Sequence, residues 1–223
     1  MGAGGQAPTI AADAQVNGAT EDRSTERLRW RPRIVPDRPR ADLPAAEVAA
    51  AALLTALGLD LTDVNLVDTP RRMAHALAEL TTSADFELTS FPNTENYDEL
   101  VLVQNIPVRS LCEHHMLPFV GVAHIGYLPA DRILGLSKFA RMTDFHCRQP
   151  QTQERLTKRI ADHLQRELDP HGVGVVIEAE HTCMSLRGAR ADGTRTVTSA
   201  LFGRLREDSR SRAEFLSLAR SQP

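Results

Sequence analysis

Two groups of metal-binding residue types, about seventy positions apart, place the strongest constraint on how this chain can fold. The first group is the run Cys112-Glu113-His114-His115, and the second is the pair His181 and Cys183. Together they offer two thiols and up to three imidazoles, which is the donor set that proteins use to hold zinc. If both groups bind one metal ion, the fold must bring two distant segments together.

The spacing within each group predicts which side chains hold the ion. Cys112 and His115 are three positions apart, which suits chelation from one tight turn, whereas His114 between them is directed elsewhere. The later pair lies in a predicted strand whose apolar face carries both His181 and Cys183. We therefore predict Cys112, His115 and Cys183 as metal ligands. We expect His114 and His181 to carry protons near neutral pH.

The third cysteine, Cys147, separates two kinds of zinc site. Three protein ligands leave an open position, as in zinc sites that activate water, whereas a fourth thiolate from Cys147 would close the site and make it structural. Cys147 has no partner at chelate spacing, and a buried thiol is the simpler interpretation. Because three cysteines cannot all pair and thiolate ligands require reduced sulfur, we expect a cytosolic enzyme.

Composition argues against several functional classes. The 223 residues, of which 42% are hydrophobic, suffice for one sizeable core. The net charge of -3 gives no global field that would attract nucleic acid or a membrane. No apolar run has the length of a bilayer span, and the first residues show no secretory signal. We therefore expect a soluble cytoplasmic protein with neither a nucleic acid nor a membrane as partner.

The chain divides into three predicted regions. Residues 1–40 are rich in Gly, Ala, Arg and Pro without apolar periodicity, and we expect a disordered tail; an arginine-rich partner- or RNA-binding arm around Trp30 is the alternative. Residues 41–99 are expected to form a helical segment, with helices over 44–57 and from 69 to about 80. Residues 100–223 are expected to form the catalytic domain.

Hydrophobic periodicity predicts an α+β fold with an antiparallel sheet in the third region. We expect strands over 100–108, 119–127, 173–184 and 194–205, the last two joined as a hairpin across a turn at 190–193. Helices are expected over 137–147 and 151–168, between the two pairs of strands, and a short helix over 211–218 closes the chain.

Basic and polar residues near helix starts indicate an anionic substrate. Ser137 and Lys138 begin a predicted helix, where free N–H groups and the helix dipole favour an anion, and Arg141 follows one turn later. Arg187 comes shortly after the metal-binding strand. Each of these features, taken alone, also fits a helix cap or a solvated arginine.

Gln153 and Glu154 lie near the start of the long predicted helix. A glutamate there is usually a surface partner of the helix dipole. A buried carboxylate at this position would instead suit the two adjacent N–H donors of a guanine-like base edge.

Several motifs of this chain resemble those of the GTP cyclohydrolase I family. The matching stretches, in order, are SLCEHHMLPFVG, GLSKFAR, QTQERLT and EHTCMSLRG, and the resemblance extends from roughly Pro44 to the end of the chain. It implies a zinc-dependent enzyme that converts GTP and water into formate and 7,8-dihydroneopterin triphosphate. That reaction is the first step toward folate, other pterins or 7-deazapurines.

The resemblance also implies an architecture and a set of site residues. Members of the family have the tunnelling fold, a four-stranded antiparallel sheet with helices on one side. In a homo-oligomer, usually a decamer, these sheets join into a barrel with active sites between subunits. Matched by position, the implied roles are zinc ligands (Cys112, His115, Cys183), catalytic histidines (His114, His181), triphosphate contacts (Ser137, Lys138, Arg141, Arg187) and guanine contacts (Gln153, Glu154).

The chain departs from the family pattern at Val122, Gln149 and Thr182, where we expect effects on subunit contacts or substrate affinity. Two other functions remain compatible with the motifs. One is a related tunnelling-fold enzyme that acts on another purine or pterin. The other is a non-catalytic assembly protein stabilised by zinc, which predicts a closed site with Cys147 bound.

Overall fold

The computed structural model of the protein describes residues 32–34 and 41–220. Its centre is a four-stranded antiparallel sheet in the order β4-β5-β7-β8. The strands are β4 (Val101–Leu111), β5 (Pro118–Leu128), β7 (Gly172–His181) and β8 (Arg195–Gly203). All four strands of the predicted sheet are thus confirmed, and with the helices around them they establish the α+β class.

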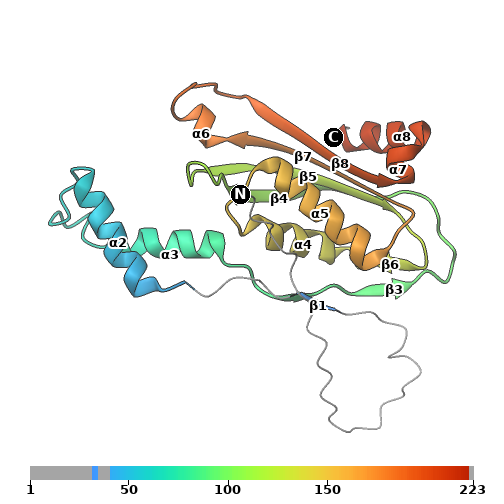
Figure 1. Cartoon of the computed structure of the whole chain (residues 1–223), viewed down its shortest axis with the longest axis horizontal. Helices are drawn as coiled ribbons and strands as arrows, with labels where there is room; N and C mark the ends of the chain where they lie inside the picture. The colour runs from blue at the N-terminus through green and yellow to red at the C-terminus, as the bar shows by residue number, and fades with distance from the viewer. Residues whose placement is uncertain (1–31, 35–40, 221–223) are drawn as a thin grey trace, which may run out of the picture.

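The sheet is covered on both faces, but unequally. Helices α4 (Ser137–Cys147) and α5 (Gln153–Leu168) pack on one face along its length (Figure 1). Two C-terminal helices, α7 (Arg204–Glu207) and α8 (Ser209–Arg220), pack on the opposite face near one end and carry a smaller core. The prediction placed the closing helix over 211–218 and missed α7.

Side-chain alternation along β7 explains this division. Val175, Ile177 and Ala179 are fully buried beneath α4 and α5, whereas Val176 between them joins the core beneath α8. On the α8 side, Phe215 packs directly onto Gly174 of β7, where an added Cβ would lie 2.6 Å from the ring. Because a side chain here would collide with Phe215, glycine at this position lets α8 approach the sheet.

Helix α5 forms where the apolar period predicts it. Leu156, Ile160 and Leu164 are fully buried on one face of the helix. Thr152 caps the N-terminus by accepting a hydrogen bond from the Arg155 N–H at 3.3 Å. At the other end Asp169 adopts a left-handed conformation with φ 44°. With Thr152 as its N-cap, the helix begins at Gln153, two residues later than predicted.

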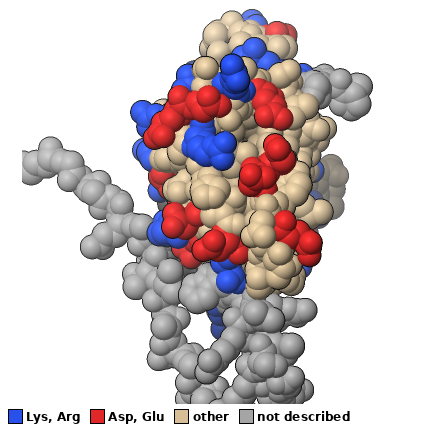
Figure 2. Space-filling view, turned by 90° about the vertical axis from the view of Figure 1, so that its right-hand side faces the viewer, with Lys and Arg blue, Asp and Glu red and all other residues tan. Residues whose placement is uncertain are grey.

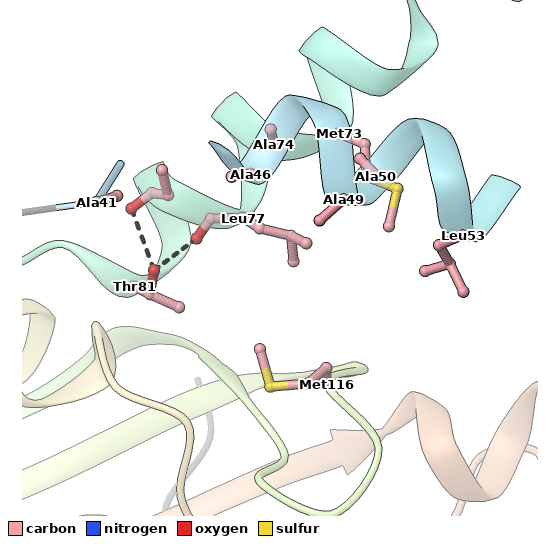
Figure 3. Close-up of a pocket in the computed structure, with 11 residues that line it drawn as sticks. Ala41, Ala46, Ala49, Ala50, Leu53, Met73, Ala74, Leu77, Thr81 and Met116 are labelled. Carbon is pink, nitrogen blue, oxygen red and sulfur yellow. Dashed lines mark hydrogen bonds between the residues drawn. The ribbon is translucent and has the colours of Figure 1, made fainter. Parts of the chain in front are cut away.

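Helices α2 (Leu43–Ala56) and α3 (Thr69–Thr81) pack against each other beside the sheet domain (Figure 1). Gly58 follows α2 with φ 85°. Asp68 does not cap α3 with its side chain, which instead accepts from Arg72 at 3.3 Å. Figure 3 shows an apolar groove between the two helices that is closed on one side by Met116, in the loop after β4.

Four short strands lie outside the prediction. β3 (Ser90–Pro92) pairs with β6 (Arg132–Leu134), and β1 (Arg33–Ile34) pairs with β2 (Phe86–Glu87). Strands of two or three residues are too short to show a period in the sequence. β1 falls within the predicted tail; residues 1–31 and 35–40 of that tail, including Trp30, lie outside the described residues.

Figure 2 shows one face of the molecule, on which basic and acidic side chains are interspersed, so this face carries no large field of one sign. Among residues 32–34 and 41–220, no helix has both the length and the apolar character needed to cross a membrane.

Candidate metal centre and active site

Cys112, His115 and Cys183 meet at one end of the sheet. One ligand atom from each side chain lies within 4.8 Å of the other two. Cys112 directly follows β4 and His115 lies in the turn after it, while Cys183 lies in α6 (Thr182–Ser185), directly after β7. β5 separates β4 from β7 in the sheet, and so the cluster spans three strands.

A tight turn presents the first two ligands. The Met116 N–H donates to the Cys112 carbonyl at 2.8 Å, and the His115 N–H approaches the same oxygen at 3.4 Å. Met116 completes the reversal with φ 54°. Within this turn the Cys112 Sγ lies 3.9 Å from His115 Nδ1. The sequence predicted chelation from such a turn, and the turn forms.

The donor set fits a zinc ion. Zn–S and Zn–N bonds of about 2.3 and 2.0 Å place tetrahedral ligand atoms about 3.5–3.8 Å apart. The separation of Cys112 Sγ and His115 Nδ1, at 3.9 Å, is close to this range. Burial raises the pKa of the Cys183 thiol, and the neighbouring Cys112 raises it further. A divalent cation between the sulfurs would offset this repulsion and favour both thiolates.

Cys147 is not a member of the cluster. It is buried, and burial raises the pKa of its thiol to about 12. Its carbonyl accepts a hydrogen bond from Ser110 Oγ at 2.7 Å. Within the described part of the chain, the metal cluster therefore has three protein ligands, without a thiol that would close it.

β7 ends earlier than predicted, and this changes how Cys183 reaches the metal position. We predicted that His181 and Cys183 share one face of a strand that continues to residue 184. The strand instead ends at His181, and Thr182–Ser185 form one helical turn. Cys183 thus approaches from a helix. Alternation of apolar residues cannot reveal such a break, because a single turn of helix has no period of its own.

His181 is held firmly beside the cluster. Its ring stacks on Phe119 with centroids 4.7 Å apart and planes inclined by 12°. Its Nε2 lies 2.8 Å from Gln153 Oε1. Burial lowers the pKa of His181, and the carboxylate of Glu154 acts in the opposite direction. The histidine is thus half-buried, positioned and next to a carboxylate, as a proton carrier requires.

His114 lies beside the ligand cluster and is open to solvent. Its side chain is 64% exposed, and its Nδ1 lies 3.8 Å from Cys112 Sγ. On the other side, His114 Nε2 lies 3.8 Å from a carboxylate oxygen of Glu113. Glu113 is also paired with Arg155 near the start of α5. This position leaves His114 accessible to a molecule that binds next to the metal.

Two glutamines form contacts that the sequence reasoning missed or assigned otherwise. Gln151 is fully buried and joins the Cys112 turn to the chain before α5, because its N–H donates to the Leu111 carbonyl and its carbonyl accepts from the Glu113 N–H. Gln153 is almost fully buried, with its side chain bonded to His181 and to β7 and β8. The positions of Gln151 and Gln153 near a helix start did not indicate these contacts.

The remaining predicted residues fall into two groups. Glu154 and Arg187 are exposed and lie near the metal end of the sheet, one at the start of α5 and the other after α6. Ser137, Lys138 and Arg141 lie in the first half of α4, whose other end is tied through Cys147 to the metal end. At 1.5 Å per residue, these three residues lie about 9 to 15 Å along the helix from Cys147, and they are not members of the ligand cluster.

The positions that depart from the family pattern lie outside the ligand cluster. Thr182 Oγ1 donates to the Pro118 carbonyl at 2.6 Å and so ties α6 to β5. Gln149 Oε1 accepts from Arg159 at 2.9 Å. Val122 pairs with Glu178 across β5 and β7. Thr182 and Gln149 thus make side-chain hydrogen bonds within the chain, and Val122 takes part in the strand pairing of the sheet.

Comparison with known proteins agrees with the family resemblance of the motifs. A family model described as GTP cyclohydrolase I matches residues 46–220. The proteins named GTP cyclohydrolase 1 from Mycobacteroides abscessus and Mycobacterium tuberculosis are 49% and 50% identical over 182 residues, covering 79% of this chain and 89% and 90% of theirs. The protein of that name from Mycolicibacterium gilvum is 50% identical over 186 residues, covering 81% of this chain and 92% of its own.

Among solved structures, the archaeosine synthase QueF-Like in its apo form aligns with 47% of this chain and 93% of its own, at 17% identity. The TM-score is 0.39.

Proposed function

Because the chain belongs to the GTP cyclohydrolase I family, we propose that Cys112, His115 and Cys183 hold its catalytic metal and that His114 and His181 carry its protons. The protein is a hydrolase that converts GTP and water into formate and 7,8-dihydroneopterin triphosphate, the first step of pterin and folate synthesis. The observation that supports the site assignment is the convergence of three ligand atoms from segments far apart in the chain.

The family is metal-dependent, and the cluster has the donors to bind a metal ion. We propose zinc, because two thiolates and an imidazole form a soft donor set that suits it. In such a three-ligand site zinc supplies Lewis acidity that activates water. The chain's own contribution is to hold the three donors on one side, so that the substrate can approach from the other.

The two histidines are proposed to divide the proton transfers. Opening the imidazole ring of guanine, releasing formate and closing the new ring each require protons to move. His181 is half-buried and fixed by its contacts with Phe119 and Gln153, so it can act at one defined atom. His114 is exposed, so it can reach a substrate and exchange protons with solvent.

Substrate recognition is proposed to involve both ends of GTP. The exposed carboxylate of Glu154 suits the adjacent N–H donors of the guanine edge. The resemblance pairs Gln153 with Glu154 in this role, although the Gln153 amide is bonded to protein groups. Arg187 lies on the metal side, where it suits the triphosphate. Holding base and phosphates together would fix the reacting carbon of the base over the metal.

We propose that Ser137, Lys138 and Arg141 contact the triphosphate bound at a neighbouring subunit. They lie in the first half of α4, about 9 to 15 Å along the helix from the end that adjoins their own metal site. β4 and β8 are the two edges of the sheet in the described chain, and each is long enough to pair with another copy. Oligomers are typical of the family; a decamer with barrel-forming sheets is the proposed state.

Two further assignments complete the proposal. A cytoplasmic location is proposed because thiolate ligands need reduced sulfur, and the three cysteines are free. Residues 41–99 are proposed as a helical segment attached to a catalytic domain over 100–223, following the tail over 1–40.

The direct test is incubation of the zinc-loaded protein with GTP. We expect formate and a pterin triphosphate in equal amounts, the pterin being detected by fluorescence after oxidation. Absence of both products with a fully metal-loaded protein would refute the assignment of this site.

A further inference from the structure

The side chain of Gln153 is bonded to His181 and to the sheet, in a place closed to solvent. Gln153 is the first residue of α5 and is 1% exposed. Its Oε1 lies 2.8 Å from His181 Nε2. Its Nε2 lies near three acceptors: the Ile177 carbonyl at 3.0 Å, the Thr196 carbonyl at 2.9 Å and Thr198 Oγ1 at 3.1 Å. Both ends of the amide are therefore engaged by protein groups.

These acceptors determine which end of the amide faces His181. The carbonyls of Ile177 and Thr196 can only accept hydrogen bonds, so the amide nitrogen of Gln153 must face them. The amide oxygen then faces His181, and it too can only accept. His181 must therefore donate its Nε2–H. A neutral His181 in this arrangement has its proton on Nε2 and a free lone pair on Nδ1.

The surroundings restrict both groups to this arrangement. The His181 ring stacks on Phe119, which is fully buried and is its register partner across β5 and β7. Thr198 Oγ1 lies 2.6 Å from Thr157 Oγ1, and Thr157 Oγ1 donates to the Gln153 carbonyl at 2.8 Å. Phe119 thus fixes the plane of the His181 ring, while Thr157 and Thr198 hold Gln153 in place.

We propose that Gln153 is a positioning residue that holds His181 as its Nε2–H tautomer and so leaves Nδ1 as the ring nitrogen with a free lone pair. The inference rests on the proposed function, because it takes His181 as a catalytic residue.

This role differs from the guanine contact that the resemblance implies for Gln153. A guanine edge would have to displace the amide from His181 or from two backbone carbonyls of the sheet. The neighbouring Glu154 is exposed at the start of α5. Base recognition therefore falls to Glu154, and Gln153 acts through His181.

Nitrogen NMR measures the tautomer directly. We would label the histidines with 15N, prepare zinc-loaded protein at about pH 8, where histidine is neutral, and assign His181 by its loss in His181→Gln. The expected spectrum shows a protonated Nε2 and an unprotonated Nδ1 for His181. In Gln153→Leu we expect a mixture of tautomers. A wild-type His181 protonated on Nδ1 would overturn the proposal.

Kinetics separate positioning from substrate binding. We expect Gln153→Leu to lower kcat about 10- to 100-fold, as for other residues that orient a catalytic histidine, with KM for GTP changed less than about threefold. Glu154→Gln should instead raise KM. Gln153→Glu keeps an oxygen acceptor for His181 but turns its second oxygen toward the Ile177 and Thr196 carbonyls, which can only accept. It should therefore keep the Nε2–H tautomer only where the carboxylate stays in place, and we expect it to recover kcat less than fully.

The matched control is Gln165→Leu, the same change on the same helix, where the amide donates to the Pro170 carbonyl far from the site. It should leave kcat, KM and tautomer unchanged. Zinc content is measured for every variant, so that a lost metal is not mistaken for a lost tautomer. A raised KM with unchanged kcat and tautomer in Gln153→Leu would assign Gln153 to guanine and refute positioning. Wild-type protein inactive on GTP would refute the proposed function while leaving the tautomer readable.

Discussion

His146 Nε2 lies 2.7 Å from His163 Nδ1, in a buried contact between α4 and α5. One ring donates and the other accepts, so the pair is satisfied only while at least one ring is neutral. Burial lowers the pKa of His163 to about 4, and it lowers that of His146 well below the usual value. Among the residues that the structure describes, His163 Nε2 finds no hydrogen-bond partner in its buried position. Protonation of this pair therefore opposes folding.

The sign of the pH effect follows from these shifts. The pKa of His163 is about 4 when folded and about 6.5 when unfolded, so the unfolded chain binds more protons between these values. The stability contributed by the neutral ring is complete above about pH 6.5 and is lost as the pH falls toward 4. The loss is at most about 3 kcal/mol for His163. Urea unfolding between pH 4.5 and 7 measures it.

His163→Gln keeps a hydrogen-bonding side chain but cannot titrate, so its stability should fall less steeply with acid than that of the wild type. The matched control is His75→Gln on the half-exposed His75 of α3, which pairs with Glu47 at 3.1 Å. Parallel stability curves for wild type and His163→Gln would show that the buried pair does not titrate on unfolding.

The three cysteines allow a matched test of the metal site. Cys112→Ala and Cys183→Ala each remove one of the three ligands, and we expect zinc binding and formate release to fall together, by at least about 100-fold. Cys147→Ala removes a buried thiol outside the cluster and should retain zinc and activity, at a cost in stability of about 1–2 kcal/mol. Metal analysis and a formate assay give the two readouts.

Loss of zinc from Cys147→Ala would support the alternative interpretation of a closed site, in which this thiol is a fourth ligand. Full activity in a metal-free Cys112→Ala protein would refute the role of the metal in hydrolysis.

The close approach of α8 to the sheet gives a test of packing. Gly174→Ala places a Cβ about where the Phe215 ring lies, since the nearest ring carbon is 2.6 Å away. We expect it to destabilise the protein by about 1–3 kcal/mol through displacement of α8. In a Phe215→Leu background the smaller side chain leaves room, so the cost of Gly174→Ala should shrink. Additive losses in this double-mutant cycle would show that the two residues do not compete for space.

The sequence predicted those parts of the fold that rest on long periodic segments. α5 follows from Leu156, Ile160 and Leu164, and β7 from alternating buried residues. The metal turn was predictable from chelate spacing. What escaped prediction depends on packing between segments: the break of β7 after His181, and the contact of Gln153 with His181 across the α5–sheet interface. No local pattern encodes such contacts, because they exist only once both segments are in place.

One departure from the family pattern became interpretable only in three dimensions. Gln149 departs from that pattern, and the guanidinium of Arg159 reaches Gln149 Oε1 and Gln151 Oε1, ten and eight positions away. A positive charge thus lies beside the buried glutamine that joins α5 to the metal turn. The pairing could not be seen from Gln149 alone.

Sharing of the active site between subunits can be tested by complementation. Cys183→Ala removes a metal ligand, and Lys138→Ala removes a proposed phosphate contact, so each pure oligomer should be almost inactive. In mixed oligomers, a metal site from a Lys138→Ala subunit can lie beside an intact Lys138 from a Cys183→Ala subunit. With equal random mixing, about one quarter of the sites combine two intact halves. Co-expressed and purified mixtures should therefore recover up to about a quarter of wild-type activity.

The matched control mixes Cys112→Ala with Cys183→Ala. Both changes damage the same half of the site, because Cys112 and Cys183 belong to one cluster within one chain. No arrangement of these two subunits gives an intact site, and so this mixture should stay inactive. Recovery in the first mixture alone requires that the metal and Lys138 come from different chains, since no single chain in it carries both. Failure to recover, in oligomers shown by mass spectrometry to be mixed, would place Lys138 and the metal in the same subunit's site.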